Sequence, residues 1–83
     1  MIPAMEEPLY VRELTAEEGQ RLRRVMEKGN GAAATWWRAQ ILLYSDLGLD
    51  TADIAPLALA TEDEVRSEIH AFNRHGLAAL HSH

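Results

Sequence analysis

Residues 61–80, TEDEVRSEIHAFNRHGLAAL, decide the fold of this chain. Thr61 and Glu64 form a capping box, a pattern in which each side chain accepts a hydrogen bond from the other residue's backbone at a helix start. The helix that they begin should end at Gly76, and residues 77–80 should then fold back over the core. Three apolar residues spaced i, i+4 and i+7 should form its inward face: Val65, Ile69 and Phe72.

Three other stretches carry helix signals. Thr15 begins a second capping box, and the helix that follows it should stop at residues 29–31, Gly-Asn-Gly. Residues 32–47 hold the most apolar helical pattern of the chain. Asp50 can cap a short third helix, which Pro56 should kink or shorten. Because no stretch alternates with the period of a strand, the sequence predicts an all-α domain of about four helices.

The chain divides into three parts. Residues 1–14 hold Pro3 and Pro8 and show no helical period, so we expect an extended N-terminal arm. Residues 15–80 form the helical domain, and residues 81–83 are left as a tail. The core is predicted from the apolar positions of the four helices and the last turn: Leu22, Trp36, Leu43, Ile54, Val65, Ile69, Phe72 and Leu80.

Length and composition exclude several classes of protein. Eighty-three residues make one small domain, and a hydrophobic share of 47% argues against a disordered chain. The net charge of −5 gives no overall attraction to phosphate or to anionic lipid. Without cysteine there is no disulfide, thiolate metal site or cysteine nucleophile. Because neither a secretory signal nor an apolar run of about 18 residues is present, we expect a cytoplasmic protein without membrane contact.

Several short strings follow one another in a definite order and spacing: YVRELTAEE at 10–18, RAQILL at 38–43, Gly48, DIA at 53–55, then Thr61, Val65, Phe72 and GLAAL at 76–80. Together they resemble the N-terminal helix-turn-helix region of bacterial insertion-sequence transposases of the mariner-like superfamily. The resemblance covers about residues 10–80, nearly the whole chain.

The resemblance implies a homeodomain-like cluster in which the short third helix and the fourth helix form a helix-turn-helix. In that motif the second helix lies in the major groove and its first residues reach base edges, here from Glu62 onward. Members of this family usually carry a separate catalytic domain that cuts DNA with acidic residues and divalent metal. Eighty-three residues leave no room for it, so the resemblance implies a non-catalytic DNA-binding module, with regulation as one role open to it.

For the DNA-binding hypothesis, basic residues are the candidate contacts. Three on the first helix share one face at i, i+3 and i+7 and can form a stripe of phosphate contacts. A solvated charged face is the alternative, because Glu17 and Glu27 can pair with them. The candidate DNA-binding residues are Arg12, Arg21, Arg24, Lys28, Thr61 and Arg66.

The start of the fourth helix supports a different hypothesis. Where the transposase family is rich in Ser, Arg and Lys, this chain carries four acids: Glu62, Asp63, Glu64 and Glu68. Facing DNA, they would repel phosphate, so they favour a protein-interaction domain that binds a basic partner. Alternatively, the first three acids only stabilise the positive end of the helix dipole.

A second apolar edge follows the predicted second helix. Trp37, Ile41 and Tyr44 recur at i, i+4 and i+7, offset from the row predicted to enter the core. Such an edge either forms a homodimer or is covered within one chain by the arm, through residues 9–11.

Neither a metal site nor an enzyme is predicted. The four histidines are poorly placed for chelation, because a spacing of five residues puts two side chains about 140° apart around a helix. They are His70, His75, His81 and His83. No arrangement of nucleophile and base, no pair of carboxylates in a cleft and no Gly-rich phosphate loop is present, so we expect no cofactor and no small-molecule substrate.

Overall fold

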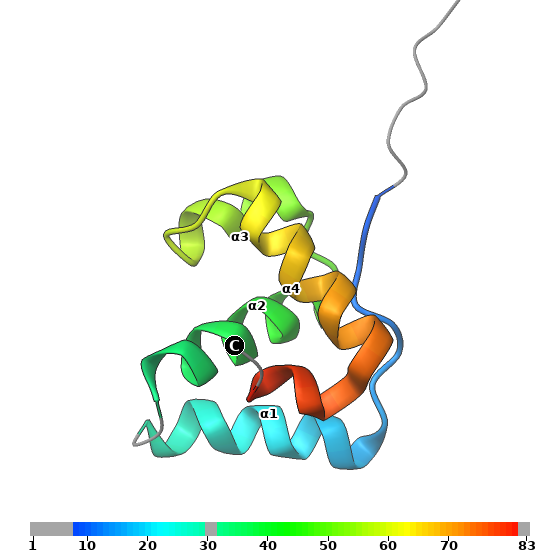
Figure 1. Cartoon of the computed structure of the whole chain (residues 1–83), viewed down its shortest axis with the longest axis vertical. Helices are drawn as coiled ribbons and strands as arrows, with labels where there is room; N and C mark the ends of the chain where they lie inside the picture. The colour runs from blue at the N-terminus through cyan, green and yellow to red at the C-terminus, as the bar shows by residue number, and fades with distance from the viewer. Residues whose placement is uncertain (1–7, 30–31, 82–83) are drawn as a thin grey trace, which may run out of the picture.

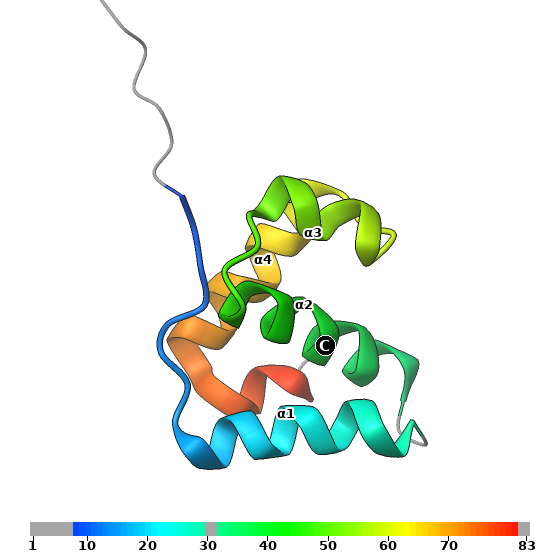
Figure 2. The ribbon, with the colours of Figure 1, turned by 180° about the vertical axis from the view of Figure 1, so that it is seen from behind.

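The computed structural model describes residues 8–29 and 32–81. In these ranges the chain forms four α-helices and a final 3₁₀ helix, with no strand, which confirms the predicted all-α class (Figure 1). The elements are α1 (Ala16–Lys28), α2 (Ala33–Asp46), α3 (Thr51–Leu57), α4 (Glu62–His75) and the 3₁₀ helix η1 (Gly76–Leu80). Seen from both sides, α1 and α3 lie on opposite sides of α2 (Figures 1 and 2).

Both predicted capping boxes are formed. Thr15 Oγ1 accepts a hydrogen bond from the Glu18 amide at 3.0 Å, and Glu18 Oε1 accepts one from the Thr15 amide at 3.0 Å. At α4 the corresponding distances between Thr61 and Glu64 are 3.1 Å and 2.9 Å. Gly29 ends α1 in the left-handed conformation with φ 62°, as a C-terminal glycine does. Residues 30–31 of the predicted stop lie outside the described ranges, as do 1–7 of the arm and 82–83 of the tail.

The short third helix is confirmed, but its predicted cap is not. Pro56 lies in the last turn of α3, which ends one residue later. Asp50 occupies the N-cap position without a side-chain capping hydrogen bond. Its carboxylate instead accepts a hydrogen bond from the Tyr10 hydroxyl, which ties the arm to the start of α3.

The predicted inward face of α4 is confirmed, whereas that of α2 is partly wrong. Val65, Ile69 and Phe72 are fully buried together with Leu22, Ile54 and Leu80. On α2 the predicted Trp36 is 36% exposed and Leu43 is only partly buried. The buried positions of α2 are Ala39, Ile41, Leu42 and Ser45. Apolar residues surround α2 on most sides, so its periodicity does not single out one face, and packing between α1 and the α3–α4 pair selects it.

The arm is extended and held to the fold by specific hydrogen bonds. The Val11 amide donates to Ser45 Oγ at 2.8 Å, and both groups are buried. Asn73 on α4 accepts from the Arg12 amide at 2.7 Å and donates to the Tyr10 carbonyl at 3.1 Å. The arm therefore joins the C-terminal halves of α2 and α4, about 30 and 60 residues away in sequence.

Phe72→Ala should lower the free energy of unfolding by about 3–5 kcal/mol, because it removes the largest fully buried side chain and leaves a cavity. This is a large part of the roughly 5–15 kcal/mol expected for a small domain. Urea unfolding followed by circular dichroism measures it. His70→Ala, an exposed position of the same helix, is the control and should change stability by at most about 0.5 kcal/mol. Equal midpoints for the two variants would contradict the packing described.

Candidate functional site

The acids at the start of α4 are divided between the fold and the solvent. Glu64 closes the capping box. Glu62 Oε2 accepts a hydrogen bond at 3.3 Å from the hydroxyl of the buried Thr51, which joins the starts of α3 and α4. Asp63 is exposed, and its carboxylate forms no side-chain hydrogen bond or ion pair with the described residues. Of the four acids predicted as one surface, Glu62 and Glu64 thus stabilise the junction of α3 and α4.

Glu68 does not belong to an exposed acidic surface, which corrects the prediction. Its side chain is 21% exposed and its Oε1 lies 3.2 Å from Nε of Arg38 on α2. Burial raises the pKa of Glu68 above its usual range, while Arg38 acts in the opposite direction. Arg38 also donates from Nη1 to the Leu80 carbonyl at 3.0 Å. The pair therefore connects α4, α2 and the end of η1.

Arg12, a predicted phosphate contact, is committed to the fold. Its two terminal nitrogens each lie 2.8 Å from a carboxylate oxygen of Glu18, a bidentate ion pair. Its guanidinium carbon also stands 4.8 Å from the ring centre of Phe72. The charge of Arg12 is therefore neutralised by a carboxylate of α1, and a phosphate would have to compete with that carboxylate.

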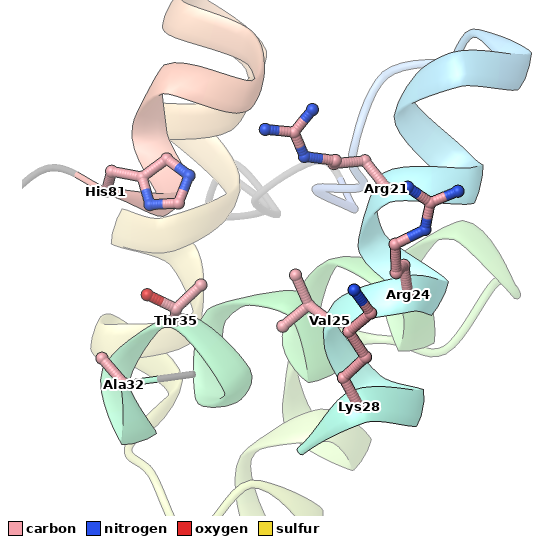
Figure 3. Close-up of a pocket in the computed structure, with 7 residues that line it drawn as sticks. All are labelled: Arg21, Arg24, Val25, Lys28, Ala32, Thr35 and His81. Carbon is pink, nitrogen blue, oxygen red and sulfur yellow. The ribbon is translucent and has the colours of Figure 1, made fainter. Parts of the chain in front are cut away.

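The other basic residues of the predicted stripe line a pocket between α1 and the start of α2. Arg21, Arg24 and Lys28 stand on one side of it, and Thr35 and His81 face them across it (Figure 3). The pocket measures about 370 Å³, and none of the described residues lining it is acidic. The stripe belongs to α1, which lies on the side of α2 away from α3 and the start of α4 (Figure 1).

The exposed outer face of α4 is a candidate surface that the sequence analysis did not predict. It consists of residues spaced i, i+4, i+7 and i+11 opposite the buried row: Asp63, Ser67, His70 and Arg74. The signal was present, because the inward row at 65, 69 and 72 determines which positions face away. Of the two predicted contacts on this segment, Arg66 is half-buried, and the Thr61 hydroxyl accepts the capping hydrogen bond of Glu64.

The apolar edge of Trp37, Ile41 and Tyr44 is covered within the chain. Ile41 is fully buried, so its predicted place on an exposed dimer surface is wrong. Trp37 is half-buried, and its Nε1 donates to the Ala58 carbonyl at 2.8 Å. Tyr44 is half-buried next to Ser45, which accepts from the arm. Burial of Ile41 in the core and the hydrogen bond of Trp37 to the end of α3 are the reasons that this edge is not free.

Exposed apolar side chains gather elsewhere. Trp36, Leu57 and Leu59 line a groove of about 760 Å³ between the start of α2 and the turn from α3 to α4. Glu64 is the one charged residue among the described residues of its lining. Of the predicted edge only Trp37 lines this groove, and the rest of its apolar lining comes from the start of α2 and from the end of α3 with the following turn.

No protein-family model, curated protein or solved structure matches this chain. Within the described ranges, no group of three or more His, Asp or Glu side chains is placed to hold a metal ion. In the same part of the chain, no helix combines the length and apolar character needed to cross a bilayer.

The ion pair of Arg12 and Glu18 predicts a specific loss of stability in acid. Arg12, with the Thr15 amide, lowers the pKa of Glu18 to about 2. In the unfolded chain the pKa of a glutamate is about 4.3, so the unfolded state binds the proton first as the pH falls. The stability that Glu18 contributes is present above pH ~4.3 and should be lost progressively toward pH 2.

Glu18→Gln should therefore make the free energy of unfolding less dependent on pH between about 4.3 and 2, measured as urea midpoints across this window. Glu17→Gln, one residue earlier on the exposed side of the same turn, should keep the wild-type dependence. Direct titration of the Glu18 side chain by NMR gives the decisive number. A value near 4 would show that the ion pair does not persist in solution.

Proposed function

We propose that this protein is a helix-turn-helix module that binds duplex DNA through the outer face of α4. One observation carries the proposal: α4 follows a seven-residue helix and a short turn, and it turns its apolar row inward and a polar row outward. In a helix-turn-helix the second helix enters the major groove, which is wide enough to admit an α-helix. The resemblance to transposase N-terminal regions supports the same assignment.

The chemistry of the outer face fits DNA better than the net charge of the chain does. Ser67 and His70 stand at its centre, where hydroxyl and imidazole groups can hydrogen-bond base edges. Arg74 is exposed one turn further on and supplies a phosphate contact. Glu68, which would repel phosphate, is turned to the opposite side by Arg38. The acid that opposes binding most directly is Asp63, and it should keep the affinity low.

A protein-interaction module is the second candidate, because the groove at Trp36, Leu57 and Leu59 exposes apolar surface that DNA does not use. The groove includes none of the polar residues on the outer face of α4. The two functions therefore use different surfaces and can be tested separately.

Arg74→Gln should weaken DNA binding and reduce the dependence of log K on log salt by about 1, because one phosphate contact is lost. Fluorescence anisotropy with labelled random and genomic duplexes at low ionic strength measures both quantities. Asp63→Lys should strengthen binding, since it replaces a repulsion by an attraction without removing a fold contact.

Arg24→Gln is the matched control, because Arg24 belongs to α1, and α1 and α3 lie on opposite sides of α2 (Figure 1). Its affinity should equal that of the wild type. Absence of binding by both the wild type and Asp63→Lys at low salt would refute the proposed function. A loss on Arg24→Gln with no loss on Arg74→Gln would place DNA on α1 instead.

A further inference from the structure

Leu59, in the turn between α3 and α4, is unfavourable for the fold in two ways. Its φ is 54°, and within residues 8–29 and 32–81 no other residue except glycine has a positive φ. Glycine adopts this backbone conformation freely, whereas the Cβ of leucine crowds the following carbonyl. In addition, the side chain is 94% exposed, so burial within the chain does not offset the strain. A strained residue that contributes no buried surface points to a role outside the fold.

Leu59 lies beside other exposed apolar side chains, which together form a groove. Leu57, 49% exposed, and Trp36, 36% exposed, line the same groove of about 760 Å³. The groove runs between the first turns of α2 and the α3–α4 turn, where Trp37 Nε1 is fixed by the Ala58 carbonyl. Its wall is thus rigid on the side of Trp37, while Leu59 projects into solvent. Clustered apolar exposure of this kind is typical of a binding surface.

Charge and size select the occupant. Glu64 is the charged residue of the described lining, and Glu62 and Asp63 precede it on the same helical turn, whereas no described lysine or arginine lines the groove. Nine described residues form the lining, well below the roughly 20–30 residues a side of a standard interface. A second copy of this chain would bring its own acids and a net charge of −5 against these carboxylates.

We propose that this groove docks a short amphipathic helix of a partner protein that carries lysine or arginine beside its apolar face. Apolar side chains of the partner, spaced i, i+3 or i+4 and i+7, contact Trp36, Leu57 and Leu59. Its basic side chains face Glu64 in the groove lining and the neighbouring Glu62 and Asp63, which raises the association rate and fixes the orientation. This inference does not depend on DNA binding, since the groove uses none of Ser67, His70 and Arg74, and Asp63 alone adjoins both surfaces.

The two tryptophans of the chain, Trp36 and Trp37, both line the groove, so intrinsic fluorescence reports its occupancy directly. The probe is a synthetic 16-residue helical peptide with leucines at i, i+3, i+4 and i+7 flanked by lysines. Its counterpart carries glutamate in place of every lysine. The lysine peptide should change the tryptophan emission saturably and more strongly at low salt, and the glutamate peptide should not bind.

The decisive variant is Leu59→Gly, because it separates binding from folding. It should raise the melting temperature, since glycine adopts a positive φ without the strain that leucine has there. It should also weaken peptide binding by about 10-fold or more. Leu47→Ala is the matched control: Leu47 is 75% exposed at the end of α2 and does not line the groove, so binding should be unchanged. Asp63→Lys should weaken peptide binding, the opposite of its expected effect on DNA.

Three results would overturn the proposal. The first is an unchanged affinity of Leu59→Gly for the lysine peptide. The second is that the lysine and glutamate peptides bind equally well, or that neither binds. The third is a concentration-dependent dimer in sedimentation that Leu59→Gly makes monomeric, which would show that a second copy occupies the groove. Failure of DNA binding would leave all three readouts unaffected, so the two proposals fail separately.

Discussion

The burial of Val65, Ile69 and Phe72 is the constraint on which the rest of the structure depends, because it fixes the rotation of α4 about its own axis. Once this row faces α2 and the arm, every other side chain of α4 has its direction set by the helical period. Glu68 then falls beside Arg38, and the outer row falls toward solvent. The character of the exposed face is thus a consequence of core packing.

The charges of this protein serve its fold more than its composition suggests. Glu18 is held by Arg12 and by the capping box of α1, and Glu64 closes the capping box of α4. Arg12 in turn stands over the ring of Phe72, so one guanidinium links the arm, α1 and the core. A count of charged residues therefore overstates both the acidic surface of α4 and the basic stripe, since it cannot distinguish paired charges from solvated ones.

The parts of the fold that the sequence predicts are the ones encoded locally. Capping boxes involve residues three apart, so the starts of α1 and α4 could be predicted correctly. The contacts of the arm could not, because Tyr10 meets Asp50 and Asn73 across 40 and 63 residues. The buried face of α2 also needed the tertiary structure, since that helix is apolar on most sides.

The candidate site could likewise not be predicted from local sequence patterns alone. The apolar edge was predicted at Trp37, Ile41 and Tyr44, but Ile41 is buried, and the groove combines Trp37 with Trp36, Leu57 and Leu59. At Leu59 the sequence carries no sign of a left-handed turn, because leucine there is the opposite of what that backbone favours. Local rules fail at Leu59, where the residue conflicts with its backbone conformation, and conflicts of this kind concentrate at functional sites.

The two proposed surfaces meet at the first turn of α4, and this determines how they would influence each other. Asp63 opposes phosphate on one side, and with Glu62 it favours a basic partner on the other. A partner that neutralises these carboxylates from the groove reduces the repulsion felt by DNA at α4, so both ligands would bind more tightly together than alone. Linkage makes this coupling reciprocal: DNA would increase the affinity of the partner by the same factor. Because the carboxylates are exposed, the coupling must weaken as salt screens them, in contrast to any coupling transmitted through the buried row of α4.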